Sequence, residues 1–527
     1  MTSIVDSPPG MQSNASTVFS DPTTFSVKFA EPIGAAVDVE PLPDCIPPDH
    51  LHRTLVLCFD GTGDQFDSDN SNVVEFFSML KKEDPSRQLV YYQAGIGTYT
   101  TPEIATPTFA KFSKLMDEMI AWNLDAHIMG GYEFLMQNYR ANDKICIFGF
   151  SRGAYTARCL AGMIHKVGLL PTCNHQQVPF AYKMYTQADE EGWKQSNAFK
   201  KTFSIDVDIE FVGVWDTVNS VGLFPRRLPF TTSNMVVHTF RHAVSLDERR
   251  AKFKANLWNC PDHHEQMLSI SDQKAKHHLD EHAAGAANKK RKTPHLHALE
   301  RRYSQDRNIE TDVEEVWFSG CHCDVGGGSV ENGAKPCLAR IPLRWMVREC
   351  FKTKSGILFH TDGLRAIGLD PASLYPEVLK RLPAVELDTA TPETSLIQSI
   401  PKGPRPPVHD STAATSSKAP VESEEVADLK DALAPIYDQL SMHWFWWLLE
   451  LLPLKHRRQE HNHSWTWWFG WNLGQGRHIP HHQQRHLKVH RSVKTRMTAE
   501  DAHGQKYTPK AFRDFEEVKL EDITWVD

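Results

Sequence analysis

One stretch constrains this chain more than any other: a short apolar segment, 145–148, followed at once by Gly149-Phe150-Ser151-Arg152-Gly153. The spacing Gly-x-Ser-x-Gly sets a serine between two glycines, which leave room for a strand and a helix to approach around a sharp turn. The segment before the motif is rich in strand formers, and the run from Ala154 favours a helix. The pattern therefore predicts a nucleophile elbow with Ser151 at its apex and the N–H of Arg152 directed at a developing oxyanion.

The rest of the chain repeats the alternation of strand and helix. Apolar runs predict further strands at 54–59, 88–93, 208–215 and 313–318. Helical patterns cover 72–80, 109–140 with a break near Gly130-Gly131, 240–250 and 341–351. Strands that alternate with helices predict an α/β fold, with a doubly wound, mostly parallel sheet of the α/β-hydrolase type.

Composition shifts divide the chain into segments. Residues 1–50 are rich in Pro, Ser, Thr and Asp and are expected to be a disordered arm, and 385–425 is expected to be a disordered linker. Between them, 51–384 forms the expected catalytic domain, with a polar surface insertion at 261–310. The segment 426–527 is rich in aromatic residues and is expected to pack on that domain as a cap.

Charge and cysteine content exclude some classes of protein. A net charge of −8 with no concentrated basic surface gives no case for nucleic acid binding. The N-terminal residues lack the apolar core of a secretory signal, and the ten cysteines are scattered without even spacing. We therefore expect free thiols and a cytoplasmic location, with possible peripheral contact to membranes.

The predicted strands end in polar or glycine-rich turns that would share one edge of the sheet. Ligands bind beyond the carboxyl ends of strands in a doubly wound sheet. Ser151, Asp216 and His322 follow three of these strands, in the chain order that α/β-hydrolase triads use. The order predicts that His322 takes the proton of Ser151 and that Asp216 orients the imidazole.

Other residues compete for these roles or complete the site. The turn with Gly61 and Thr62 is expected to supply the second oxyanion donor, beside the N–H of Arg152. His242 and His490 are alternative bases, and Asp324 is an alternative to Asp216. Each also has a plainer interpretation, as a packed histidine or a turn-capping acid.

No metal or cofactor is expected at this site. Cys321-His322-Cys323 with Asp324 suggests zinc, but ligands so close along an extended chain do not converge, and no pair of C-x₂-C motifs is present. No cofactor motif is visible, and hydrolysis by a serine needs none.

Several blocks together resemble a known family, the uncharacterised α/β-hydrolases related to the type VI secretion phospholipase effectors. The resemblance covers roughly residues 53–350, and the blocks come in the family's order: 57–63, 95–98, 149–158, 213–218 and 317–328. It implies a lipase-like serine hydrolase that acts on phospholipid esters. The alternative function is a catalytically inactive scaffold that serves as a protein- or membrane-interaction module, since a fold alone assigns no activity.

An aromatic segment from Trp444 to Trp471 has two interpretations. Its apolar run is too short to span a bilayer. Tryptophans beside Lys455, Arg457 and Arg458 are typical of a membrane-facing surface or lid. The same side chains also suit a cap buried against the hydrolase core.

Overall fold

The computed structural model of the chain describes most of the part from residue 42 to the C-terminus. The described ranges are 42–61, 64–95, 124–218, 228–232, 237–259, 299–300, 311–387, 395–400, 422–459, 465–484, 487–513 and 518–527. The expected disordered arm lies outside them except for its last residues, as do most of the insertion 261–310 and most of the linker 385–425.

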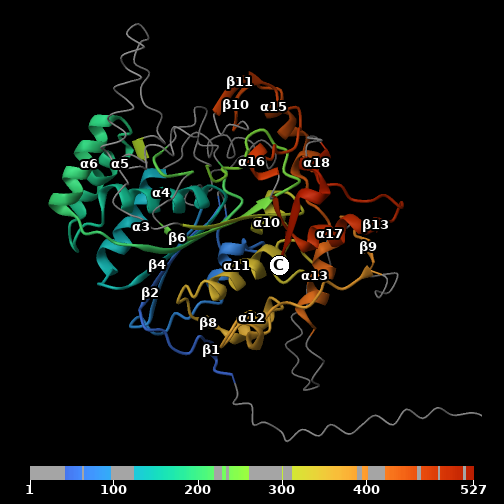
Figure 1. Cartoon of the computed structure of the whole chain (residues 1–527), viewed down its shortest axis with the longest axis horizontal. Helices are drawn as coiled ribbons and strands as arrows, with labels where there is room; N and C mark the ends of the chain where they lie inside the picture. The colour runs from blue at the N-terminus through green and yellow to red at the C-terminus, as the bar shows by residue number, and fades with distance from the viewer. Residues whose placement is uncertain are drawn as a thin grey trace, which may run out of the picture. The chain divides into compact units, whose positions relative to one another are not determined.

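Within this described part, an eight-stranded parallel sheet runs through the unit 43–527 (Figure 1). Its order is β14-β12-β7-β6-β5-β4-β2-β3. The strands are β2 (Thr54–Phe59), β3 (Gln88–Gln93), β4 (Lys144–Phe150), β5 (Ile209–Trp215), β6 (Val237–Ser245), β7 (Asp312–Phe318), β12 (Leu487–His490) and β14 (Ile523–Val526). The predicted fold class, a doubly wound α/β sheet, is confirmed.

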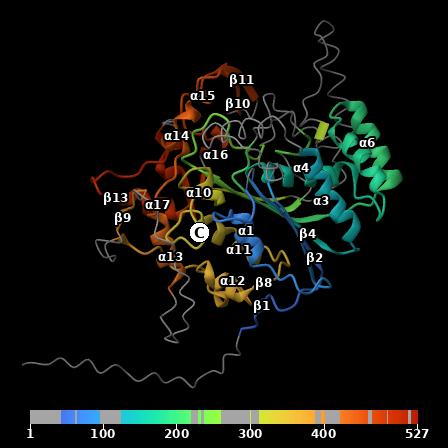
Figure 2. The ribbon, with the colours of Figure 1, turned by 180° about the vertical axis from the view of Figure 1, so that it is seen from behind.

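Helices cover both faces of the sheet because the side chains of each strand alternate between two apolar cores. Leu55, Leu57 and Phe59 of β2 belong to one core and Val56 and Cys58 to the other. The first core receives α3 (Leu124–Asn138), α4 (Ser151–Val167), α5 (Val178–Thr186) and α6 (Glu190–Phe203). The second receives α1 (Asn72–Ser78), α11 (Arg340–Lys352) and α12 (Thr361–Ala366), which Figure 2 shows from behind.

Two predicted helices differ from the structure. The run 240–250 was predicted to be a helix, but its first half is part of β6, a central strand paired with β5 and β7. Its polar residues misled the prediction, because Arg241 and His242 are buried beside carboxylates rather than exposed on a helix face. Likewise, α3 runs through Gly130 and Gly131 without a break, since Gly131 packs tightly against Phe59 and Leu160.

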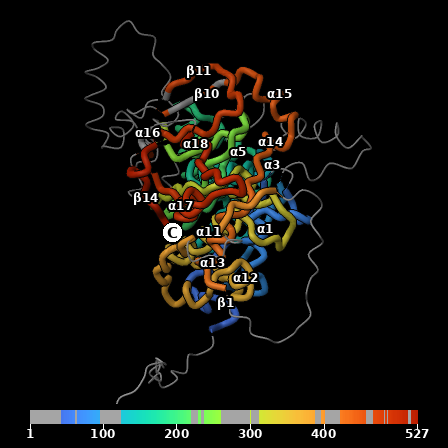
Figure 3. The backbone as a smooth tube through the Cα atoms, turned by 90° about the vertical axis from the view of Figure 1, so that its right-hand side faces the viewer, coloured from blue at the N-terminus to red at the C-terminus, as the bar shows by residue number. Residues whose placement is uncertain are grey.

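The C-terminal segment does more than pack on the sheet, since β12 pairs with β7 and with β14 and so extends it. Its further elements are α13 (Glu424–Ala432), α14 (Gln439–Met442), η5 (Trp444–Trp446), α15 (Trp447–Glu450), β10 (Leu454–Gln459), β11 (Trp465–Gly470), α16 (His481–Gln484), α17 (Arg491–Thr498) and α18 (Lys510–Arg513). In Figure 3, β10, β11 and α15 lie at the opposite end from α12 and β1 (Cys45–Ile46).

Short strands tie the expected arm and linker to the fold. β1 falls within the last residues of the arm and pairs with β8 (Phe359–His360), while β9 (Leu396–Ile397) falls within the linker and pairs with β13 (Glu500–Asp501). None of the helices in the described ranges is long and apolar enough to cross a membrane.

Candidate active site

Ser151 stands at the junction of β4 and α4 in a strained backbone conformation. Its φ is +58°, in the left-handed region that a residue with a side chain rarely adopts. The two glycines of the motif make the turn possible. A Cβ on Gly149 would lie 2.6 Å from the backbone of Gly153, and one on Gly153 would lie 2.3 Å from the carbonyl of Asp60. The elbow geometry therefore depends on glycine at both positions.

Asp216 and His322 come from neighbouring parts of the same sheet edge and meet Ser151. The Nε2 atom of His322 is 2.8 Å from Oγ of Ser151, and its Nδ1 atom is 2.5 Å from Oδ2 of Asp216. Asp216 follows β5, and His322 begins the short helix α10 (His322–Gly326) just after β7. The three residues named from the sequence thus form one line of hydrogen bonds.

The His322 imidazole is enclosed by aromatic rings. Phe150 and Phe253 lie with ring centroids 4.7 and 4.9 Å from that of His322. Burial lowers the pKa of His322, although the Asp216 carboxylate opposes the shift. The imidazole is therefore neutral at pH 7, which is the form that can accept a proton.

Asp216 is fully buried and remains ionised because the Arg477 cation and hydrogen-bond donors contact its carboxylate. Burial alone would raise its pKa, but Arg477 and His322 hold the pKa well below its usual value. Arg477 binds both carboxylate oxygens, at 2.5 and 2.8 Å. Sequence reasoning missed this arginine, because no local motif marks a residue that reaches the site from 261 positions away.

The expected oxyanion donors are only partly described. Arg152 occupies the first turn of α4, where backbone N–H groups point out of the helix end. The N–H of Gly61 donates to the carboxylate of Asp60 at 2.8 Å, so it is engaged within its own turn. Thr62 lies outside the described residues.

The alternative bases occupy other surroundings. His242 is buried, accepts a hydrogen bond from the N–H of Thr217 on Nε2, and binds Glu315 through Nδ1 at 2.7 Å. His490 binds Ser492 through Nδ1 and stacks on Phe318, and burial lowers its pKa to about 3. Neither of these contacts joins Ser151.

Asp324, the alternative acid, is held by backbone hydrogen bonds. It accepts hydrogen bonds from the backbone N–H groups of Cys321 and Tyr437, and burial raises its pKa to about 7. It thereby fastens the turn after β7 to the C-terminal segment. In the part of the chain that the structure describes, no three His, Cys, Asp or Glu side chains are grouped as metal ligands would be.

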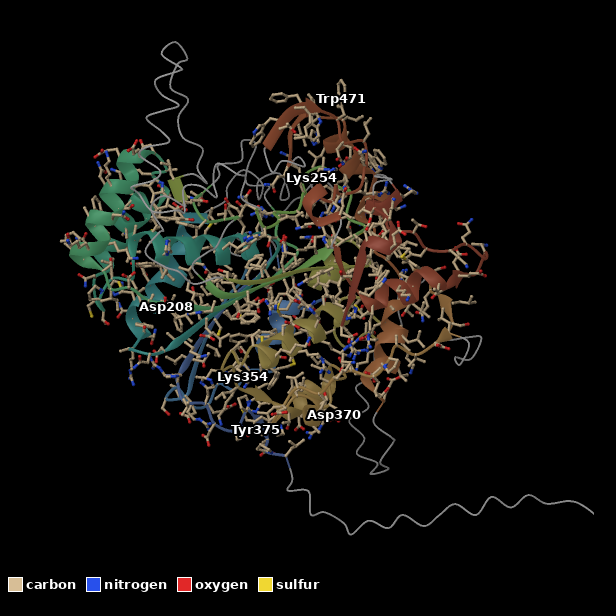
Figure 4. All side chains as sticks on the ribbon, in the orientation of Figure 1. Asp208, Lys254, Lys354, Asp370, Tyr375 and Trp471 are labelled. Atoms are coloured by element: carbon tan, nitrogen blue, oxygen red, sulfur yellow. The ribbon has the colours of Figure 1, made fainter. Side chains whose placement is uncertain are left out.

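The C-terminal segment exposes a group of large apolar side chains. We call it the cap surface, and its members are Trp444, Trp447, Leu451, Trp467, Trp468, Phe469 and Trp471. Trp444 and Phe469 are each 75% exposed. Residues of β11 are exposed on both faces, so the β10–β11 hairpin projects from the fold, with Trp471 at the upper edge of Figure 4. Trp446, by contrast, turns inward against Phe253.

Comparison with known proteins identifies the family of this chain. Residues 53–349, more than half of the chain, match the family described as "T6SS, Phospholipase effector Tle1-like, catalytic domain". The chain is also 29% identical to "Uncharacterized protein YEL023C" of Saccharomyces cerevisiae, over 89% of this chain and 83% of the yeast protein.

Two solved structures are similar over part of the chain. One is an uncharacterized protein from Pseudomonas aeruginosa (17% identity, TM-score 0.31, 61% of this chain and 49% of the other). The second is the Tle1 effector bound to the VgrG spike of the type 6 secretion system (16%, 0.26, 54% and 53%). The chain thus spans about half the length of each. On the family match, the chain belongs to the Tle1-like phospholipase effector family, and it is a phospholipase-like hydrolase.

Proposed function

We propose that the chain hydrolyses the carboxylic esters of phospholipids, with Ser151 as nucleophile, His322 as general base and Asp216 as its orienting acid. One observation carries the proposal: the line of hydrogen bonds from Ser151 Oγ through His322 to Asp216. The family match supports the lipid class of the substrate.

The reaction follows from this geometry in two stages. Oγ of Ser151 attacks the ester carbonyl as His322 takes its proton, and the same proton then passes to the departing alcohol. A water molecule gives up a proton to His322 and attacks the acyl-serine, which releases the fatty acid and returns the proton to Ser151.

The negative oxygen of each tetrahedral intermediate needs donors that are fixed in advance. The N–H of Arg152 is well situated, because it lies one residue beyond the nucleophile at the start of α4. We assign the second donor to the turn with Gly61 and Thr62. Gly61 would have to release the Asp60 carboxylate to take part, so Thr62 is the better candidate.

The cap surface is proposed to rest on the membrane that holds the substrate. Tryptophan rings are stable at headgroup depth, and exposed apolar patches of this kind mark interaction sites. Lys455 and Arg457 of β10 lie in register with Phe469 and Trp467 of β11, so basic and aromatic residues share the hairpin. Each basic residue near an anionic surface adds about 1 kcal/mol to binding.

Release of fatty acid from phospholipid vesicles tests the proposed chemistry. The full chain should release fatty acid, and Ser151→Ala should remove this activity while leaving thermal unfolding unchanged. The matched control is Ser196→Ala, another buried serine that lies on α6 and binds only the carbonyl of Trp193 in the described contacts. Activity in Ser151→Ala would refute the mechanism, and an inert wild type would favour the scaffold alternative.

Vesicle co-sedimentation tests the proposed membrane contact. Binding should require anionic lipid and should weaken as salt rises, because screening shortens the reach of surface charges. A protein that ignores anionic vesicles at low salt would contradict the contact.

A further inference from the structure

The carboxylate of Asp216 has two side-chain partners, and the triad accounts for only one of them. His322 binds Oδ2 at 2.5 Å, while Arg477 donates to Oδ1 at 2.5 Å and to Oδ2 at 2.8 Å. The N–H of Ser245 also donates to Oδ1 at 2.9 Å. A buried carboxylate therefore holds a neutral imidazole and a permanent cation at the same time.

The guanidinium of Arg477 is itself fixed in place. Beyond Asp216, it donates to Oγ of Ser245 at 2.7 Å and to the carbonyl of Phe253 from Nε and Nη2, at 3.1 and 2.6 Å. These contacts match the five N–H groups of an arginine. Arg477 is 2% exposed, so the group is held in a dry environment where a bidentate pair orients its partner strongly.

Arg477 belongs to the C-terminal segment and lies outside the residues matched by the family, 53–349. It follows Trp471 by six positions. Residues next to the cap surface also hydrogen-bond to the loop that carries Phe253. Asn472 donates to the carbonyl of Arg249 at 2.7 Å, and Glu450 accepts from the N–H of Ala251 at 2.5 Å. The site near His322 is thus built jointly by the sheet edge and the C-terminal segment.

We propose that Arg477 is a positioning residue of the triad: it clamps the carboxylate of Asp216 and so holds that carboxylate against the His322 imidazole. The inference rests on the proposed function, in which Asp216 orients the catalytic imidazole. It adds that residues 53–349 alone lack a part of the working site, which the C-terminal segment supplies.

Other charged groups also lie near the Asp216–His322 pair. The other charged or titratable groups are Glu248 and Arg250 beside His322, His242 and Glu315 behind Asp216, and Lys254 beside Arg477. Glu248 and Arg250 form an ion pair at 2.8 Å, so their charges largely cancel at the imidazole. Glu315 is paired with His242, whose burial keeps its pKa low and its ring neutral. Arg477 is the cation in direct contact with the Asp216 carboxylate.

Removing the Arg477 cation shifts the pKa of the Asp216–His322 pair in one definite direction. With Arg477 present, protonation of the pair places a second positive charge near the guanidinium. Without Arg477, the pair gains its proton at higher pH. The acid limb of the activity profile, where His322 becomes protonated, therefore moves upward in pH.

The test compares full-length variants by kcat/KM for a soluble ester and by the rate of fluorophosphonate labelling, each across pH. Arg477→Met should move the acid limb up by about one pH unit. It should also slow labelling at the pH optimum about tenfold, because a carboxylate without its clamp orients the imidazole less well. Arg477→Lys keeps the positive charge but loses the two-pronged contact of the guanidinium with Asp216. Its acid limb should stay near that of the wild type, while its rate of labelling falls.

Arg344→Met is the matched control. Arg344 is equally buried and binds Asp428 and Asp431 at 2.6 and 2.7 Å, but it joins α11 to α13 rather than the triad. This variant should lower the unfolding temperature and leave the acid limb unchanged. A folded Arg477→Met with the wild-type acid limb would overturn the proposal, as would an equal shift in Arg344→Met.

Arg477→Lys provides a readout if Arg477→Met does not fold. Its fluorophosphonate labelling should be slower than that of the wild type, and equal labelling rates in the two proteins would overturn the proposal. Ser151→Ala separates the two claims. If that variant still hydrolyses esters, the proposed function fails. If it is inert while Arg477→Met keeps the wild-type profile, only the role of Arg477 fails.

Discussion

The carboxyl edge of the central sheet and the cap surface hold their side chains in opposite ways. At the sheet edge, Ser151, Asp216 and His322 are at most 5% exposed, and hydrogen bonds fix each of them. On the cap surface, the large aromatic rings are 39–75% exposed, and a two-stranded hairpin carries several of them. The proposed function assigns the two regions different roles: the buried edge carries the chemistry, and the exposed cap places the protein on its substrate.

Changes at the sheet edge should abolish turnover of every ester. His322→Ala removes the proposed general base and should lower kcat by about 10⁴-fold or more for vesicles and for a soluble ester alike. His242→Ala is the matched control, because this histidine is also buried and bound to a carboxylate. It should retain activity within about tenfold but lose stability, about 1–3 kcal/mol for each partner left unsatisfied. Equal losses of activity in the two variants would break the assignment.

Asp216→Asn should lower kcat by about 10⁴-fold, because an amide favours the wrong imidazole tautomer. It should also lower the free energy of unfolding by about 3–5 kcal/mol, since Arg477 would keep a buried charge without its partner. Chemical denaturation and ester hydrolysis measure the two effects. A variant with lower activity but wild-type stability would show that Arg477 is not committed to this carboxylate.

The pH dependence of kcat/KM should place the acid limb below about pH 6.5, because burial lowers the pKa of His322. The neutral base is present above this pKa and is lost as pH falls through it. Asp216 contributes no limb in this range, because its pKa lies well below the usual value. A rate that already declines below pH 8 would contradict the neutral, buried imidazole.

Changes on the cap surface should have the smallest effect and should depend on the substrate. The triple variant Trp444→Ala, Trp467→Ala, Trp471→Ala should lower vesicle turnover about tenfold and leave hydrolysis of a soluble ester unchanged. Phe180→Ala with Phe203→Ala is the control, since these exposed rings lie on α5 and α6, away from the hairpin in Figure 1. An equal loss on both substrates would remove the distinction between the two regions.

The sequence predicts the first region better than the second for a physical reason. A strained turn needs glycines at fixed spacing, so Ser151 is visible from local residues, and the ends of parallel strands bring Asp216 and His322 to the same edge. Arg477 cannot be identified from local sequence, because its role depends on where a distant segment of the chain folds back. The same limit hides β12 and β14, which extend the sheet after a long gap in sequence.

The wrong helix prediction and the open question about the tryptophans have a related cause, which is packing between distant residues. Segment 240–250 contains Arg241 and His242, which suggest a helix with a polar face until Glu349 and Glu315 are known to face them. On the cap, composition alone left open whether the tryptophans are buried. The fold buries Trp446 against Phe253 and exposes Trp444, two residues away, and this difference depends on packing that no periodicity encodes.

Covalent labelling at a single residue tests the central claim most directly. The full-length chain is treated with a fluorophosphonate at pH 7.5, and the modified peptide is identified by mass spectrometry. We expect one adduct on Ser151 at close to one equivalent, no adduct in Ser151→Ala, and labelling at least about a hundredfold slower in His322→Ala. A folded protein that remains unlabelled, or that is labelled at another residue while Ser151 is unmodified, would contradict the account.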